Sequence, residues 1–210
     1  MTDHIRFDYS SAGVETAAAK DELRRDIEAR MTKISAEERS AASARLVERI
    51  QALPQYAEAR SVLLYSALPD EVDMDPIMDD LLGRGRELLL PVLNIRESDI
   101  SIVSVADPRR ELRDGAYGIL EPLDGMPLSD LNGIDFVIVP GRSFDAAGRR
   151  LGRGRGCYDE FLARLKPFGS GGPMKLGVAF ACQLSEAVPT GPLDVSMDAV
   201  ATESTFIRPD

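Results

Sequence analysis

The sequence predicts an α/β fold: a three-layer αβα sandwich with a mostly parallel central sheet and an N-terminal helical pair. Short apolar runs bounded by turn residues recur along the chain, and several lack alternation, as expected of strands covered on both faces. Helical patterns separate some of these runs. The chain has 210 residues, of which 44% are hydrophobic and 29% charged, enough for one large core. We therefore expect a single domain over residues 16–210, preceded by a mobile extension, residues 1–15.

The helices at the start of the chain are the most clearly marked elements. A first helix is expected over residues 16–31, where apolar residues recur every four positions among charges. A second begins after the capping box formed by Ser35 and Glu38 and ends near Pro54. The elements expected after these are strands at residues 61–66, 87–93, 100–105, 134–140, 175–180 and 199–204, and helices at residues 75–84 and 158–166.

The charge balance excludes several classes of partner. Lys and Arg number 25 against 35 Asp and Glu, a formal charge of −10, so a nucleic-acid backbone or an anionic membrane would repel the protein. No apolar run approaches the roughly 18 residues of a membrane span, and the N-terminus lacks the pattern of a signal peptide. We expect a soluble, cytoplasmic monomer that acts on a small molecule.

Histidine and cysteine narrow the chemistry further. The only histidine is His4, so Ser-His-Asp catalysis and His-rich metal sites lose support. Cys157 and Cys182 form neither a Cys-x-x-Cys pair nor a disulfide framework, which suits a reducing compartment. The chemistry is therefore expected to use carboxylates, Lys and Arg, backbone amides, or a hard metal bound through oxygen.

Residues 149–165, RRLGRGRGCYDEFLARL, place alternating glycines and arginines between a predicted strand and a predicted helix. In open parallel sheets ligands bind beyond the carboxyl ends of strands. Glycines let the backbone wrap closely around a phosphate and the arginines add positive charge, so the stretch favours an anion cradle for a nucleoside triphosphate. A flexible basic loop is the alternative. The similar sequence GRGR at residues 83–86 follows a predicted helix rather than a predicted strand, and its glycines are expected to end that helix.

Asp159 falls in the first turn of the predicted helix that follows these glycines. A carboxylate is favoured there by the helix dipole alone. Beside a bound triphosphate it would acquire a second role, because Mg²⁺ binds one or two carboxylates together with phosphate oxygens. The residues alone leave both interpretations open.

The stretch VPGRSFDAAGRRLGRGRGCYD resembles the signature of the 5-formyltetrahydrofolate cyclo-ligase family. Other motifs of that family appear in the same order, and the resemblance spans residues 20–205. Several spaced motifs in order are far more specific than any one of them. These motifs are AKDELR at 19–24, YSALPDEVD at 65–73, GAYGILEP at 115–122 and DVSMDAVATE at 194–203.

The resemblance implies an ATP- and Mg²⁺-dependent closure of 5-formyltetrahydrofolate to 5,10-methenyltetrahydrofolate, with release of ADP and phosphate. The formyl oxygen would take the γ-phosphoryl group before N10 attacks the formyl carbon. Phosphoryl transfer depends mainly on positioning and charge neutralisation, so it needs no histidine.

The resemblance also implies roles for individual residues. Lys20 and Arg24, four apart on one helical face, match residues that contact the ATP phosphates; alone they would be solvated surface charges. Glu71 matches an acid that contacts the folate near its reacting nitrogens, and Arg153 and Arg155 complete the implied catalytic set. The implied nucleotide loop is Arg150, Leu151, Gly152, Arg153, Gly154, Arg155, Gly156, Cys157 and Tyr158. The implied substrate contacts are Glu71, Ser66, Tyr117, Gly154, Gly156 and Cys157. The implied metal carboxylates are Asp159 and Asp198.

The chain departs from the family pattern at Cys157, where a tyrosine is usual, and at Arg155, where lysine is common in some relatives. Two alternatives remain: an ATP-using paralogue that acts on another pterin or amide, and a non-catalytic regulator that binds folate or nucleotide. Binding of 5-formyltetrahydrofolate and the absorbance of the methenyl product would separate these from a cyclo-ligase.

Overall fold

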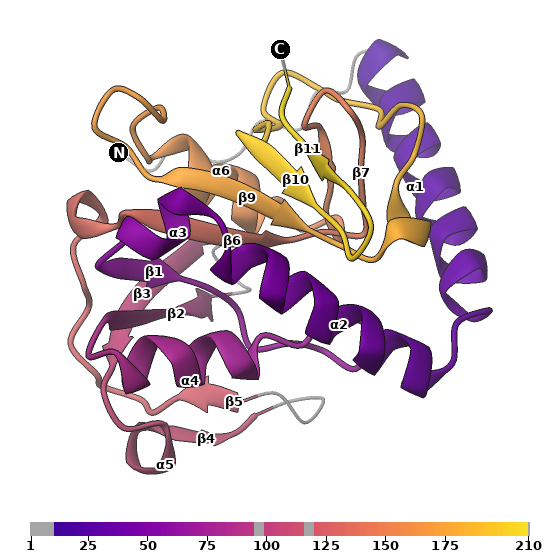
Figure 1. The fold of residues 1–210 in the computed structure, drawn as a ribbon. Helices are drawn as coiled ribbons and strands as arrows, with labels where there is room; N and C mark the ends of the chain where they lie inside the picture. The colour runs from indigo at the N-terminus through magenta and orange to yellow at the C-terminus, as the bar shows by residue number, and fades with distance from the viewer. Residues whose placement is uncertain (1–10, 95–98, 116–119, 210) are drawn as a thin grey trace, which may run out of the picture.

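The computed structural model describes residues 11–94, 99–115 and 120–209, and its central feature is a seven-stranded sheet (Figure 1). The strands are β1 Ser61–Leu63, β2 Glu87–Asn94, β3 Asp99–Val105, β6 Phe136–Pro140, β9 Met174–Val178, β10 Ala199–Ala201 and β11 Phe206–Ile207. Their order across the sheet is β11-β10-β9-β6-β1-β2-β3. The strands from β10 to β2 are parallel, whereas β3 and β11 pair antiparallel at the two edges. The predicted α/β fold with a mostly parallel sheet is confirmed.

The chain changes its direction of travel across the sheet between β1 and β6. From β1 it moves one way to β2 and β3, and from β6 it moves the other way to β9 and β10. The two strands pair directly, with Val62 opposite Phe136 and Leu63 opposite Val137. In doubly wound sheets such a switch point is where ligands bind. The loops that follow β1 and β6, residues 64–74 and 141–156, therefore leave the sheet side by side at its carboxyl edge.

Helices cover both faces of the sheet, which makes the three layers. One face carries α2 (Ala36–Gln51), α3 (Pro54–Glu58) and α4 (Asp75–Gly83), and the other carries α6 (Cys157–Ala163) with the small hairpin of β7 (Ser143–Phe144) and β8 (Arg150–Leu151). Figure 1 shows α2 and α4 in front of the strands and α6 behind them. Because successive strand residues point to opposite faces, Phe136 joins the core beneath α2 whereas Val137 joins the core beneath α6.

The first helix, α1 (Ser11–Met31), lies along the carboxyl edge of the sheet rather than on a face (Figure 1). Near its end, Arg30 donates to the carbonyls of Cys182 (3.4 Å) and Leu184 (3.0 Å), in and beside the short 3₁₀ helix η3 (Ala181–Gln183) that follows β9. The helix begins at residue 11, five residues before its predicted start. Residues 11–15 therefore lie in α1, residues 1–10 lie outside the described part of the chain, and the mobility expected of residues 1–15 stays a prediction.

Two local sequence signals are confirmed in detail. The capping box of α2 is present: the Glu38 N–H donates to Ser35 Oγ at 3.1 Å, and the Ser35 N–H donates to Glu38 Oε2 at 2.8 Å. The glycines at residues 83–86 end α4, because Gly85 adopts φ +65° and the Arg86 N–H donates to the Leu81 carbonyl at 2.8 Å.

Each predicted strand is present, but three of them end early. β1, β9 and β10 stop at Leu63, Val178 and Ala201, where the predicted runs continued for two or three residues. The residues beyond these ends leave the sheet to build the loops at its carboxyl edge. Elements that the sequence did not predict are α3, α5 (Pro108–Glu111), β4 (Leu112–Asp114), β5 (Leu120–Pro122), η2 (Leu131–Gly133), η3, β7, β8 and β11. In the described part of the chain, no helix combines the length and apolar character needed to span a membrane.

Candidate functional site

Charged side chains from three segments meet at the switch point of the sheet. The loop after β1 supplies Asp70 and Glu71, and the loop after β6 supplies the arginines between residues 142 and 155. Helix α1 supplies Lys20 and Arg24 from the side. The sequence predicted most of these residues, and the fold brings them to one edge.

Arg153 connects the glycine loop to the acidic loop. Its guanidinium lies 2.8 Å from Asp70 and 2.9 Å from Glu71, and its Nε–H also donates to Glu71 at 3.1 Å. Burial alone raises the pKa of Asp70, but the hydrogen bond and charge of Arg153, joined by Arg142, lower that pKa below its usual value. Burial likewise lowers the pKa of Arg153, and Glu71 and Asp70 more than reverse this. Asp70 is therefore ionised and Arg153 is charged at neutral pH.

Helix α1 presents both of its predicted ATP contacts to this edge. Lys20 Nζ lies 2.5 Å from the carboxylate of Asp194, and the side chains of both are largely covered, at 19% and 17% exposed. Arg24 donates its Nε–H to the carbonyl of Gly152 at 3.0 Å. The four-residue spacing therefore points both side chains at the loops that follow the strands.

The glycines of the loop are required by its backbone. Gly154 and Gly156 adopt φ +98° and +72°, which side-chain-bearing residues rarely adopt. A Cβ at Gly152 would lie 2.9 Å from the Arg150 guanidinium, and one at Gly154 would lie 3.4 Å from that of Arg24. The glycines thus allow two arginines to approach the backbone closely.

Arg150 is the buried cation of the site. Its side chain is 4% exposed, pairs with Asp159 at 2.7 Å, and lies 5.4 Å from the centre of the Tyr158 ring. The Nη1–H group donates weakly to the carbonyl of Pro140 at 3.4 Å. Its Nε–H is buried and has no hydrogen-bond partner among the described residues. The sequence predicted Arg150 and Asp159 as separate ligands, and the structure shows them as a pair.

The two predicted metal carboxylates have different partners. Asp159 accepts from Arg150 and, at 3.3 Å, from the N–H of Val195. Asp198 accepts from the N–H of Lys175 at 2.7 Å and pairs with its ammonium at 2.8 Å, at the amino end of β9. Asp194 directly precedes Val195, whose N–H donates to Asp159. The role of Asp198 stays a prediction, and no group of three or more His, Cys, Asp or Glu in the described chain could hold a metal.

The remaining predicted residues have varied surroundings. Leu151 is wholly buried in β8, and its carbonyl accepts from the Arg142 N–H at 2.7 Å. Ser66 Oγ accepts from the N–H of Leu120 at 2.9 Å. Arg155 is exposed. Tyr117 lies outside the described residues.

Cys157 and Tyr158 begin α6 and are mainly packing residues. Cys157 is 7% exposed, and burial raises the pKa of its thiol. Burial also raises the pKa of the Tyr158 phenol far above its ordinary value, with Glu71 adding to the effect. Both groups are neutral at physiological pH, so Cys157 has no thiolate to act as a nucleophile.

Sequence reasoning missed Arg142 and Asp194. Arg142 pairs with Asp70, and Asp194 pairs with Lys20, across separations of 72 and 174 residues. Both stand in motifs that carry the family resemblance, but the resemblance implied no role for either. Asp194 accepts the Gly191 N–H at 2.5 Å, an arrangement common in ordinary turns. Only the order of the strands brings these residues to the site.

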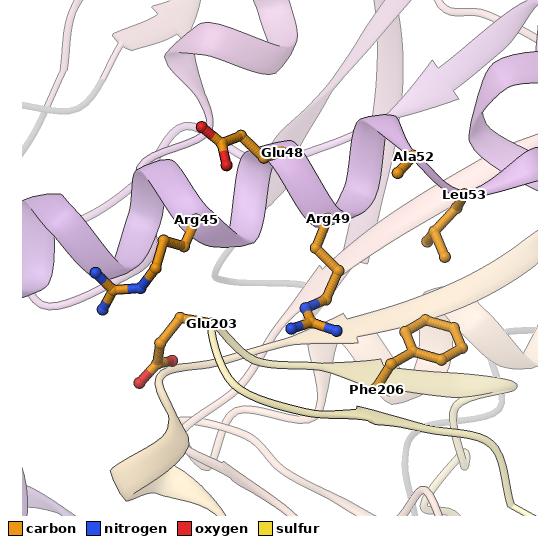
Figure 2. Close-up of a pocket in the computed structure, with 7 residues that line it drawn as sticks. All are labelled: Arg45, Glu48, Arg49, Ala52, Leu53, Glu203 and Phe206. Carbon is orange, nitrogen blue, oxygen red and sulfur yellow. The ribbon is translucent and has the colours of Figure 1, made fainter.

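A separate cleft lies between α2 and the end of the β10–β11 hairpin, with a volume of about 620 Å³ (Figure 2). Its lining residues are Arg45, Glu48, Arg49, Ala52, Leu53, Glu203 and Phe206. None of the predicted site residues is among them. Two cations stand there against two acids, so the cleft lacks the excess of positive charge found around the glycine loop.

The chain thus has a doubly wound α/β sheet with arginines, a glycine loop and carboxylates at its switch point, which is where proteins of this fold class bind ligands. The model of the 5-formyltetrahydrofolate cyclo-ligase family matches residues 16–203. The chain therefore belongs to this family, and the prediction that it is an enzyme of the ligase class is confirmed.

Individual relatives agree with the family match. The chain is 28% identical over 199 residues to the 5-formyltetrahydrofolate cyclo-ligase of Mus musculus, covering 92% of this chain and 98% of the relative. It is 31% identical over 157 residues to that of Escherichia coli strain K12, covering 74% and 85%. The solved structure of Aquifex aeolicus 5,10-methenyltetrahydrofolate synthetase superposes with a TM-score of 0.76 at 34% identity, covering 90% of this chain and 92% of that one.

Proposed function

We propose that this protein closes 5-formyltetrahydrofolate to 5,10-methenyltetrahydrofolate in a reaction that uses ATP and Mg²⁺ and releases ADP and phosphate. Membership of the cyclo-ligase family supports the substrate and the reaction. The observation that carries the proposal is the meeting of α1 with the glycine loop at the switch point, where Arg24 donates to the Gly152 carbonyl.

The cations around the glycine loop fit a triphosphate. Lys20 and Arg150 are each held by one carboxylate, and a phosphate oxygen would take the place of that carboxylate. The buried Nε–H of Arg150, which lacks a partner among the described residues, has donor capacity left for a ligand. Arg24 would add a third charge from α1. These residues bind and orient the phosphates, which is most of what phosphoryl transfer requires.

The acids released from these cations fit a magnesium ion. Asp159 and Asp194 would hold it, since the amide that follows Asp194 already contacts the Asp159 carboxylate. Two carboxylates are few for a site made by protein alone, but they suit Mg²⁺, which completes its shell with phosphate oxygens and water. When bound, the ion would neutralise charge on the phosphates.

Ring closure takes place beside the acidic loop. The formyl oxygen attacks the γ-phosphorus and ADP leaves, which turns that oxygen into a good leaving group. N10 then attacks the formyl carbon, gives up its proton, and phosphate departs, so that the methenyl cation spans N5 and N10. Glu71, 14% exposed and held by the Leu68 N–H at 3.1 Å, is placed to stabilise that cation. Arg153 would neutralise charge on the transferring phosphoryl group.

The test is the absorbance of the methenyl product. Enzyme, 5-formyltetrahydrofolate, ATP and Mg²⁺ together are expected to produce it, and omission of ATP or of Mg²⁺ is expected to abolish it. If folded protein binds the folate and ATP but forms no product, a non-catalytic role replaces the proposal. If it binds ATP but not the folate, a paralogue acting on another substrate replaces it.

A further inference from the structure

Arg142 is a fixed cation at the switch point, and the family resemblance implied no role for it. It stands two residues after the end of β6, its guanidinium pairs with Asp70, and its side chain is 12% exposed. Its backbone is held on both sides: the N–H donates to the Leu151 carbonyl at 2.7 Å, and the carbonyl accepts from Gln183 Nε2 at 3.0 Å. Gln183 is itself 2% exposed. Arg142 is therefore anchored in the protein body.

Arg153, the other cation on Asp70, is held far less firmly. Its side chain is 44% exposed, and it lies between two glycines, one of which, Gly154, has φ +98°. The two arginines and two acids form a chain of alternating charge that sums to zero. We name this set the ion-pair chain; it consists of Arg142, Asp70, Arg153 and Glu71.

The order of charges in the ion-pair chain determines which acid loses its partner when the Arg153 side chain moves away to contact a ligand. If Arg153 were the sole partner of both acids, its departure would leave two partly buried carboxylates unpaired, which is costly. Arg142 keeps Asp70 paired after the departure. Glu71 alone is released, still oriented by the Leu68 N–H, and becomes free to face the folate.

We propose that Arg142 is a positioning residue for the reaction: it holds Asp70 so that Arg153 can exchange the two acids for the transferring phosphoryl group. This inference rests on the proposed function. Arg142 itself touches neither substrate. Its effect passes through Asp70, whose pKa it helps to keep low.

The test compares Arg142→Met, Arg142→Lys and the double variant Arg142→Met/Asp70→Asn by their kcat, their KM for ATP and the pH dependence of kcat. Without Arg142, Asp70 holds Arg153 as its only cation, so Arg142→Met is expected to lower kcat about tenfold with KM for ATP within about twofold of wild type. The acid limb of its pH profile is expected to move to higher pH, because Asp70 loses a cation that lowers its pKa. Arg142→Lys is expected to have a kcat and an acid limb that lie between those of Arg142→Met and the wild type.

The double variant separates positioning from packing. With no carboxylate at residue 70 to retain Arg153, it is expected to recover kcat to within about threefold of wild type. The stoichiometry of MgADP binding by calorimetry corrects each kcat for the fraction of folded enzyme. A wild-type kcat and acid limb in Arg142→Met, or a double variant no faster than Arg142→Met, overturns the inference. If Arg142→Met does not fold, the double variant and Arg142→Lys still decide whether Arg142 is a positioning residue. If the wild type itself forms no product, the proposed function fails, which is a separate result.

Discussion

Asp194→Asn is expected to have opposite effects on ATP binding with and without Mg²⁺. Lys20 Nζ lies 2.5 Å from the Asp194 carboxylate, so a triphosphate must break this ion pair before it can bind the lysine. The asparagine side chain keeps the size of the aspartate and an oxygen for the Gly191 N–H, but it carries no charge. Lys20 is thereby released without loss of the turn.

The magnitude depends on the burial of the pair. Both side chains are less than one-fifth exposed, so the pair is stronger than the 0 to about 1 kcal/mol of a surface ion pair, and weaker than a fully buried one. We take about 1–2 kcal/mol, which corresponds to binding about 5- to 30-fold tighter for metal-free ATP. In the presence of Mg²⁺ the substitution is instead expected to weaken ATP binding, because one of the two carboxylates proposed to hold the ion is lost.

Calorimetric titration of ATP in EDTA, and then in excess Mg²⁺, measures both effects. Asp124→Asn is the matched control, since it removes the same charge from an exposed pair with Arg113. Its ATP affinity is expected to equal that of wild type under both conditions. Equal or weaker binding of metal-free ATP by Asp194→Asn would refute the reasoning, and so would unchanged binding of ATP in Mg²⁺.

Other substitutions test the remaining parts of the site. Asp159→Asn is expected to raise the Mg²⁺ concentration needed for turnover about 10- to 100-fold while the protein stays folded; a normal Mg²⁺ dependence contradicts the assignment. Glu71→Gln is expected to lower kcat/KM for the folate about tenfold and to leave ATP affinity within about twofold, and an unaltered folate response counts against its role. The folded-state pKa of Asp70 is lowered, so its stabilising contribution is present above its unfolded pKa of about 3.9 and is lost as pH falls through the folded value. Asp70→Asn is therefore expected to lower Tm at pH 7 but not at pH 2, and an equal loss at both values would show that the charge is not responsible.

The parts of this fold that sequence could predict are those with local causes. The capping box of Ser35 and Glu38 and the glycine that ends α4 depend on residues a few positions apart, and both are present. Periodicity also placed Lys20 and Arg24 on one face of a helix, and both reach the glycine loop or its neighbours. The start of α1 was missed because residues 11–15 carry neither an apolar period nor a cap signal.

The pairing of charges could not be predicted, because it depends on strand order. Asp194 and Arg142 stand in loops within motifs that carry the family resemblance, but no spacing or periodicity in those motifs indicates which residue either of them contacts. They meet Lys20 and Asp70 only because β1 and β6 adjoin at the switch point and α1 crosses the carboxyl edge. Sequence motifs indicated which loops matter, and the fold determines which acid faces which cation.

A crystal structure with ADP and Mg²⁺ tests the central claim most directly. We predict phosphates between α1 and the glycine loop, with Lys20 moved from Asp194 to a phosphate oxygen and the ion on Asp159. A nucleotide bound elsewhere, for instance in the cleft beside Arg45 and Arg49, with the Lys20–Asp194 pair intact, would contradict this prediction.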